Sequence, residues 1–271
     1  MDENCKIGSD TVPLLKYNSD DLSRQEKHAL QHDNRVIEIG KPQRFFVNNA
    51  ISTTKYNRYN FMCKNLSEQF SKAANLYFLI LAILQAIKPV SITNGIPFIL
   101  LPLTIIVLLT MVKDVFEDYK RYKSDEEENK KPATVWRDNK WIDINWEDIQ
   151  VGDLCKVLKD EFFPCDLILL ASADYSKGQC FIETKNLDGE TNLKSKQVVD
   201  EVKSKAKDMD STLALKETMV FAEAPNVVLS RFKGSIMVSG EKVPLSFHNF
   251  LLRGCILRNT DFIIGTSVYT G

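Results

Sequence analysis

Apolar residues gather in two neighbouring runs in the first half of the chain. Residues 73–87 contain no charged side chain, and residues 89–112 contain none either. Because a helix needs about 20 apolar residues to cross a bilayer, the pattern predicts a transmembrane hairpin with helices at residues 73–88 and 96–112. Pro, Ser, Asn and Gly in residues 89–95 favour a connecting loop. The alternative interpretation is a pair of helices buried in a soluble core.

The charged residues that flank this hairpin indicate its orientation. Lysines and arginines cluster on both sides, whereas the connecting loop is preceded by Lys88 alone. The positive-inside rule places both flanks in the cytosol, so residues 1–72 are expected to form a cytosolic N-terminal segment and residues 89–95 an exoplasmic loop. Residues 113–131 continue the helical pattern with charges four positions apart, which predicts a stiff cytosolic stalk. An ordinary charged surface helix fits the same residues. Pro102 is expected to kink the second helix.

From residue 132 the pattern changes from helical to short and strand-like. β-Branched and aromatic residues recur in runs separated by turn-forming pairs such as Asp138-Asn139. We expect strands at residues 134–136, 141–144, 154–158, 167–171, 180–183, 226–232, 235–239, 250–257 and 262–269. Residues 200–216 are charged and helix-prone, and we expect an insertion there. The pattern of residues 132–271 is typical of a mainly-β domain of sandwich or barrel type, so the fold class is an α+β membrane protein.

The amino-acid composition of the chain limits the kinds of molecule and metal ion that it is expected to bind. The chain has 35 Lys and Arg against 36 Asp and Glu, which excludes a globally basic surface for nucleic acid. The six cysteines are scattered without metal-ligand spacing, which favours reduced thiols in the cytosol over disulfides. His28 and His32 stand four residues apart but have no third ligand near them, so a solvated helix face is the better interpretation than a metal site. No apolar segment lies near Met1, and no signal peptide is expected.

The stretch with catalytic potential is Asp188-Gly189-Glu190-Thr191, directly after the strand expected at residues 180–183. Gly189 allows the backbone of an exposed turn to approach another surface closely. Glu190 presents a carboxylate that can act as a general base on water, provided that a partner domain supplies the electrophile. Thr191 adds a hydroxyl. Asp and Gly are also common turn residues, so the stretch by itself is better explained as an ordinary turn.

The order of these features resembles the N-terminal third of a P-type ATPase, and most closely the type IV branch, the phospholipid flippases. The resemblance covers residues 35–271. Ion-pumping members usually carry Thr at the position of Asp188, so the aspartate favours lipid over ion as cargo. The matching motifs are Phe46-Val47-Asn48-Asn49, ISTTKYN at 51–57, EQFSKAANLYF at 68–78, DGETNLK at 188–194, Ala224-Pro225-Asn226, Phe232-Lys233-Gly234, Leu251-Leu252-Arg253-Gly254-Cys255 and Leu257-Arg258-Asn259-Thr260.

The resemblance implies a fold and a mechanism. Residues 132–271 would form the cytosolic actuator domain, a distorted jelly roll that rotates during ATP-driven transport and brings its loop to a phosphorylated aspartate of another domain. Glu190 would position and activate the attacking water, Gly189 would permit close approach, and Asp188 and Thr191 would shape the loop. The complete enzyme would use ATP and Mg²⁺. This chain would bind neither, because its sequence contains no DKTGT phosphorylation motif and no nucleotide-binding domain.

The resemblance also implies a substrate path and partners. The first span of a flippase helps to form the path of the lipid headgroup, and Gln85 and Ala86 match the position of a pair of gate residues. A polar residue within a span is costly, which favours a functional role for Gln85, although a place at the membrane interface fits it equally well. Asn75 is open to both interpretations. The implied partners are membrane phospholipid, the missing phosphorylation and nucleotide-binding domains, and an accessory two-span glycoprotein subunit.

The leading interpretation is therefore a flippase fragment that is truncated at Gly271 and inactive by itself. One alternative is a P-type ATPase with another cargo. The second alternative belongs to another class, a short non-catalytic membrane protein that uses the actuator fold as an interaction module.

Overall fold

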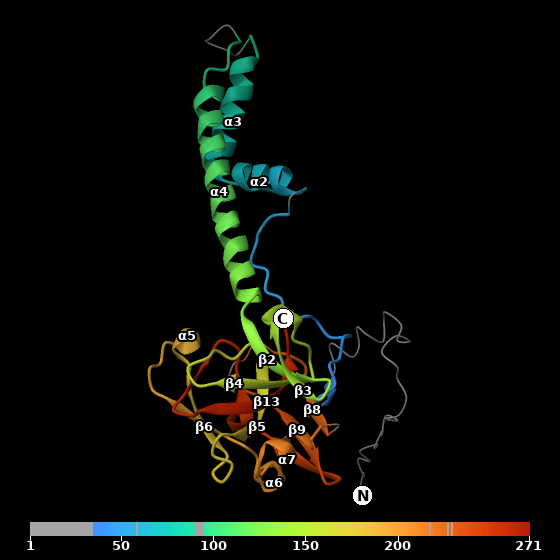
Figure 1. Ribbon diagram of the computed structural model, residues 1–271. Coiled ribbons are helices and arrows are strands. Elements are labelled where there is room, and N and C mark those ends of the chain that lie inside the picture. The colour runs from blue at the N-terminus through green and yellow to red at the C-terminus, as the bar shows by residue number, and fades with distance from the viewer. Residues whose placement is uncertain (1–34, 58, 90–94, 217, 227, 229) are drawn as a thin grey trace, which may run out of the picture. The chain divides into compact units, whose positions relative to one another are not determined.

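The computed structural model describes residues 35–57, 59–89, 95–216, 218–226, 228 and 230–271 (Figure 1). The chain divides into two compact units. The β unit comprises residues 1–50 and 132–271, and the helical unit comprises residues 51–131. The His28 and His32 pair lies outside the described residues.

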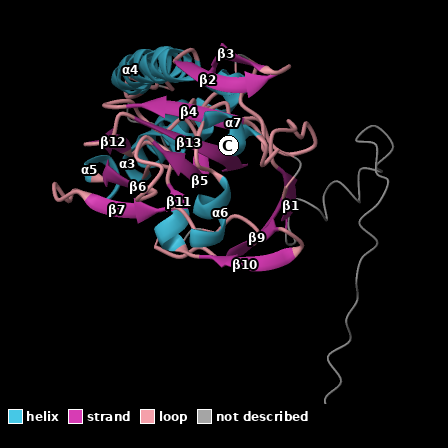
Figure 2. Cartoon of the chain, turned by 60° about the horizontal axis from the view of Figure 1, so that its bottom comes forward, coloured by secondary structure: helices cyan, strands magenta, loops and turns pink. Residues whose placement is uncertain are grey.

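Within the described residues, the β unit contains three sheets in which neighbouring strands run antiparallel (Figure 2). Their strand orders are β11-β5-β13-β4-β2-β3, β1-β8-β9-β10 and β12-β6-β7. The strands are β1 (Arg35–Glu38), β2 (Pro132–Arg137), β3 (Lys140–Asn145), β4 (Leu154–Leu158), β5 (Asp166–Ser172), β6 (Gln179–Glu183), β7 (Lys194–Gln197), β8 (Met219–Ala222), β9 (Gly234–Val238), β10 (Glu241–Leu245), β11 (Phe250–Leu251), β12 (Ile256–Arg258) and β13 (Phe262–Tyr269). This arrangement agrees with a mainly-β actuator domain.

Strand β13 lies at the centre of the largest sheet, between β4 and β5. Residues 263–268 are all buried, as expected for an uncharged run covered on both faces. The register against β5 shifts after Ile264. At the shift, a Cβ on Gly265 would lie 2.9 Å from the carbonyl oxygen of Ile168. The strand can therefore approach β5 this closely only because residue 265 has no side chain.

The segment before the helical unit packs into the β unit. Strand β1 pairs with β8, and Ile37 is fully buried. Asn49 is also fully buried, and its Nδ2 donates to the carbonyl oxygens of Trp146 and Pro164 at 2.8 and 3.0 Å. Arg253 Nη1 donates to Asn49 Oδ1 at 3.0 Å. From the sequence these residues are expected in one N-terminal segment, 1–72. Their packing into the β unit could not be predicted, because the residues that they contact are distant along the chain.

The expected strands at residues 134–136, 141–144, 154–158, 167–171, 180–183, 235–239 and 262–269 correspond to β2, β3, β4, β5, β6, β9 and β13. The strand expected at residues 226–232 is not found in the part of this range that the structure describes, residues 226, 228 and 230–232. Asn226 Oδ1 accepts a hydrogen bond from the Val228 backbone N–H, a local turn that competes with strand pairing. The strand expected at 250–257 is divided into β11 and β12 by a turn at Gly254, whose φ is 81°. The insertion contains α6 (Asp200–Lys205) and α7 (Met209–Leu213).

The helical unit contains α2 (Phe61–Phe70), α3 (Ala73–Ala86) and α4 (Leu100–Asn129). Helices α3 and α4 contact one another side by side (Figure 1). Within the described part of the chain, no helix combines the length and apolar character that crossing a membrane requires. The predicted transmembrane hairpin is therefore not confirmed. The reason for expecting a kink at Pro102 does not apply, because this residue lies in the first turn of α4. A residue without an N–H interrupts no hydrogen bond within the helix there.

Residues 51–57 run along α4 and are held by its side chains. Asn129 exchanges two hydrogen bonds with the backbone of Ile51, at 2.8 and 2.9 Å. The buried Asp125 accepts from the backbone N–H and the hydroxyl of Thr53, each at 2.7 Å. Asp118 accepts from the Lys55 backbone N–H at 2.7 Å. These contacts give the extended segment its backbone partners without a sheet.

Candidate functional site

The loop of residues 184–193 connects β6 to β7, which are adjacent strands of one sheet. It begins with the single turn α5 (Lys185–Asp188), and Gly189 ends that turn with φ at 76°. This left-handed backbone favours glycine. A Cβ at Gly189 would meet no atom within 4 Å. Glycine is therefore favoured at residue 189 by its backbone conformation and not by a steric clash. The space above the residue is open to an approaching surface.

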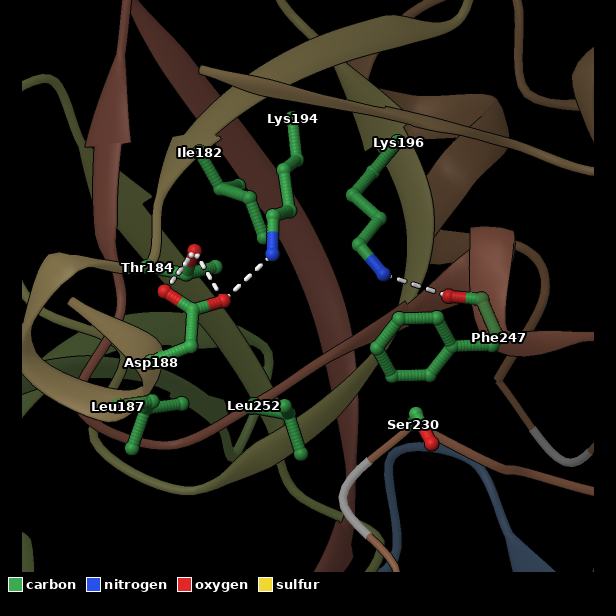
Figure 3. Close-up of a pocket in the computed structure, with 9 residues that line it drawn as sticks. All are labelled: Ile182, Thr184, Leu187, Asp188, Lys194, Lys196, Ser230, Phe247 and Leu252. Atoms are coloured by element: carbon green, nitrogen blue, oxygen red, sulfur yellow. Dashed lines mark hydrogen bonds and ion pairs between the residues drawn. The ribbon is translucent and has the colours of Figure 1, made fainter. Parts of the chain in front are cut away.

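Asp188 organises the loop through three donors, two of which are drawn in Figure 3. The hydroxyl of Thr184 donates to both carboxylate oxygens at 2.9 Å, and the Glu190 backbone N–H donates to Oδ1 at 2.9 Å. The Lys194 ammonium lies 2.5 Å from Oδ2. Hydrogen bonding from Lys194, and next from the Glu190 N–H, lowers the pKa of Asp188 to about 2. Asp188 is therefore ionised at neutral pH and fixes the backbone beneath the tip.

Glu190 stands at this tip with its side chain 59% exposed, and its Oε2 lies 2.9 Å from Lys194 Nζ. Lys194 thus bridges both carboxylates, and its pKa is raised, chiefly by the hydrogen bond to Asp188 and then by that to Glu190. An ion pair this exposed is screened by solvent and contributes little to stability. The Glu190 carboxylate is therefore held at the loop surface but can be released by a modest competing interaction.

All four residues expected to be catalytic lie in this one loop. Thr191 is exposed and adjacent to Glu190. Sequence analysis assigned no role to Thr184 or Lys194, which complete the loop's hydrogen bonds. For Lys194 a signal existed, because the residue stands four positions after Glu190 in the DGETNLK run. For Thr184 there was none, since the bond depends on the turn formed by α5.

The residues expected along a substrate path belong to the helical unit. Gln85 Oε1 accepts a hydrogen bond from the Ile99 backbone N–H at 3.4 Å, at the start of α4. Ala86 is the exposed last residue of α3. Asn75 is buried, and its Nδ2 donates to the carbonyl oxygen of Gln69 at 2.9 Å, which joins α3 to α2. Gln85 and Asn75 therefore make local structural contacts within the helical unit.

The described residues do not fit a divalent cation. They contain no group of three His, Cys, Asp or Glu side chains arranged to hold a metal ion. Around the loop, Asp188 is already occupied by Lys194 and Thr184. Hard cations such as Mg²⁺ bind through several convergent oxygen atoms, and the described residues around the loop do not offer such a set.

Comparison with known proteins gives two family matches. Residues 23–99 match the model described as phospholipid-translocating ATPase N-terminal, and residues 127–226 match the P-type ATPase actuator domain. The Glu190 loop lies within the second match.

Individual relatives agree with these matches. The chain is 40% identical over 226 residues to phospholipid-transporting ATPase IC of Mus musculus, which covers 83% of this chain and 18% of the relative. It is 35% identical over 258 residues to phospholipid-transporting ATPase 1 of Arabidopsis thaliana, covering 93% and 22%. It is 42% identical over 229 residues to phospholipid-transporting ATPase VD of Homo sapiens, covering 83% and 16%. The chain thus spans about a fifth of the length of these relatives, and it is similar to their N-terminal part and to the actuator domain of P-type ATPases.

Proposed function

We propose that this chain is the N-terminal part of an ATP-driven phospholipid flippase and supplies the loop that dephosphorylates the enzyme. The observation that carries the proposal is the Glu190 loop, a fixed turn with an exposed carboxylate at its tip and open space above Gly189. It lies in the part of the chain that matches actuator domains. Phospholipid is proposed as the substrate because the relatives are named phospholipid-transporting ATPases.

In this proposal the loop meets a phosphorylated aspartate on another domain. Lys194 releases Glu190, whose carboxylate then orients a water molecule and accepts its proton as the water oxygen attacks phosphorus. The bond between phosphorus and the aspartate carboxylate breaks, so the aspartate is regenerated and inorganic phosphate is released. Asp188 keeps the backbone of the turn in place through its bond from the Glu190 N–H. Gly189 leaves room for the acyl phosphate, and Thr191 lines the same tip. ATP and Mg²⁺ belong to the phosphorylation and nucleotide-binding domains, which lie outside this chain.

We place α3 and the first part of α4 in the bilayer as the first two spans, with residues 1–72 and 113–271 on the cytosolic side. Support comes from large apolar side chains that are exposed along both helices, which a soluble surface rarely presents together. Residues of α3 in this group are Leu76, Tyr77, Phe78, Ile80, Ile83 and Leu84. Residues of α4 are Leu100, Leu101, Ile105, Ile106, Leu108, Leu109 and Val112. The C-terminal part of α4 and the two residues after it then form the cytosolic stalk, residues 113–131.

In this proposal Gln85, Ala86 and Asn75 lie along the path of the lipid headgroup. Gln85 and Ala86 stand at the end of α3, where a headgroup would enter or leave. Membrane phospholipid is the substrate, and the partners are the remaining domains of the pump and an accessory two-span subunit.

A chimera tests the proposed function. Residues 35–271 replace the matching segment of full-length mouse phospholipid-transporting ATPase IC, and ATP hydrolysis is measured with and without added phospholipid. We expect hydrolysis that rises when phospholipid is added and does not respond to Na⁺, K⁺ or Ca²⁺. Stimulation by one of these ions, with no response to phospholipid, would assign the chain to an ion pump instead.

A further inference from the structure

A pocket of about 180 Å³ lies directly beside the Glu190 loop. Figure 3 shows it between the Asp188 side of the loop and the turn that carries Phe247. Its walls are mostly apolar and come from Ile182, Leu187, Leu252 and the ring of Phe247. The side chain of Lys196 reaches into this pocket from β7.

Lys196 is unusual because only 3% of its surface is exposed. Its ammonium donates to the carbonyl oxygen of Phe247 at 2.6 Å and stands 3.6 Å from the centre of the Phe247 ring. An ammonium carries three donors. Within the described part of the chain, the bond to Phe247 is the single hydrogen bond of this group. The remaining donors of the ammonium have no oxygen acceptor among the described residues, and the ring of Phe247 lies beside them.

Among the residues that the structure describes, no anionic side chain pairs with this buried ammonium. Asp188, the acidic residue of the pocket, is bound to Lys194 and Thr184. Burial raises the pKa of the Cys180 and Cys255 thiols near Lys196 to about 12, so both are neutral. The remaining charged neighbour, Lys194, repels it. Burial is the largest cause that lowers the pKa of Lys196, to about 8. A buried cation without a counterion is destabilising, and an anion that reached it would relieve that strain.

We propose that this pocket is a binding site for a small organic carboxylate, whose anionic group pairs with Lys196 and whose apolar group packs on Ile182, Leu187 and Leu252. The size supports an apolar group of one ring, because a protein cavity of about 150 Å³ lined by apolar side chains holds benzene. The charge selects a monoanion, since one cation is uncompensated. The mostly apolar wall disfavours a multiply charged ligand such as free phosphate.

The pocket and the loop share Thr184, Leu187 and Asp188. A bound carboxylate would therefore stabilise the turn that carries Glu190. Any effect on enzyme turnover depends on the proposed function, whereas binding itself does not, so binding is what the test measures.

The test is calorimetric titration of the full 271-residue chain, purified in detergent, with benzoate and with its neutral counterpart benzamide. We expect benzoate to bind and benzamide to bind at least about ten-fold more weakly, the factor that about 1.4 kcal/mol of charge-assisted bonding provides. The variant Lys196→Met keeps the apolar stem and should lose benzoate binding. Lys242→Met is the matched control, because Lys242 also stands over a ring, that of Phe221 at 4.2 Å, but lies on the exposed edge strand β10.

A second measurement needs no variant. Benzoate affinity of the unaltered chain should fall as pH rises from 7 to 10, because the Lys196 ammonium loses its proton over this range while benzoate stays anionic. Equal affinity for benzoate and benzamide, unchanged binding in Lys196→Met, a flat pH profile, or no benzoate binding at millimolar concentration would each overturn the proposal. Because no step requires ATP, failure of the flippase assignment would leave a positive binding result intact.

Discussion

At the scale of single residues, Asp188 determines the shape of the candidate site more than Glu190 does. Asp188 accepts bonds from Thr184, Glu190 and Lys194, whereas Glu190 contributes its carboxylate to the surface. The sequence predicted which four residues form the tip, because the motif is contiguous. It could not predict that Lys194 joins the two acidic side chains, since their distances depend on the turn formed by α5 and on the pairing of β6 with β7.

The first residue-scale prediction concerns this turn. Asp188→Ala removes the acceptor of the Glu190 backbone N–H, so exchange of that amide with solvent should become about ten-fold faster, as expected when one charge-assisted hydrogen bond is lost. Asp188→Asn keeps an acceptor oxygen and should give a smaller increase. Asp200→Ala is the control, because Asp200 makes a similar exposed ion pair with Lys203 in α6. Unchanged exchange at residue 190, measured by NMR, would contradict the role of Asp188.

The second residue-scale prediction concerns pH. Burial raises the pKa of Asp166 to about 6 from its ordinary value of 3.8, against opposing contributions from Arg253. The folded state therefore holds a proton between these two values that the unfolded chain has released. The free energy of unfolding should decrease as pH rises from about 4 to about 6, by on the order of 3 kcal/mol at most, since each pKa unit corresponds to about 1.4 kcal/mol.

Asp166→Asn should remove this dependence while still accepting the bond from the Arg253 backbone N–H, which is 2.8 Å long. Asp210→Asn, at an exposed position of α7, is the control and should retain it. Urea titrations followed by tryptophan fluorescence report on the β unit, because Trp136, Trp141 and Trp146 all belong to it. An unaltered pH slope in Asp166→Asn would disprove the assignment.

At the scale of elements, the sequence predicted strands that have an apolar pattern of their own. It did not predict strands that form only because they pair with a neighbouring strand. Strand β13 has a continuous apolar run and was expected at its full length, residues 262–269. Strand β7 has the sequence KSKQ, in which Lys196 alone is buried, so pairing with β6 and not composition makes it a strand. Strand β1 was missed for the same reason, because its partner β8 lies far along the chain.

The element-scale prediction concerns the extended segment of residues 51–57. Asp125→Ala removes both bonds to Thr53, so the Thr53 backbone N–H should exchange at least about ten-fold faster while α4 itself stays helical. Glu127→Ala is the control, because Glu127 is exposed and pairs with Lys123 on the same helix. Equal exchange at Thr53 in the two variants would show that Asp125 does not hold the segment.

At the scale of the whole molecule, the Glu190 loop lies in a segment that matches the actuator domain of P-type ATPases. The chain spans about a fifth of its relatives, and the proposed reaction needs an aspartyl phosphate from another domain. We therefore expect the 271-residue chain, incubated with labelled ATP, to form no phosphoenzyme. An acid-stable labelled band at 30.9 kDa would contradict this expectation.

The central claim is that Glu190 activates the water that removes the phosphoryl group. The most direct measurement is the decay of labelled phosphoenzyme after an unlabelled ATP chase, in the mouse ATPase IC chimera that carries residues 35–271. Glu190→Gln keeps the size of the side chain but cannot accept the proton, so phosphorylation should persist and decay should slow by about a hundredfold or more. Glu201→Gln, an exposed position in α6, should decay like the unaltered chimera. Decay of the Glu190→Gln phosphoenzyme at the unaltered rate would contradict the account.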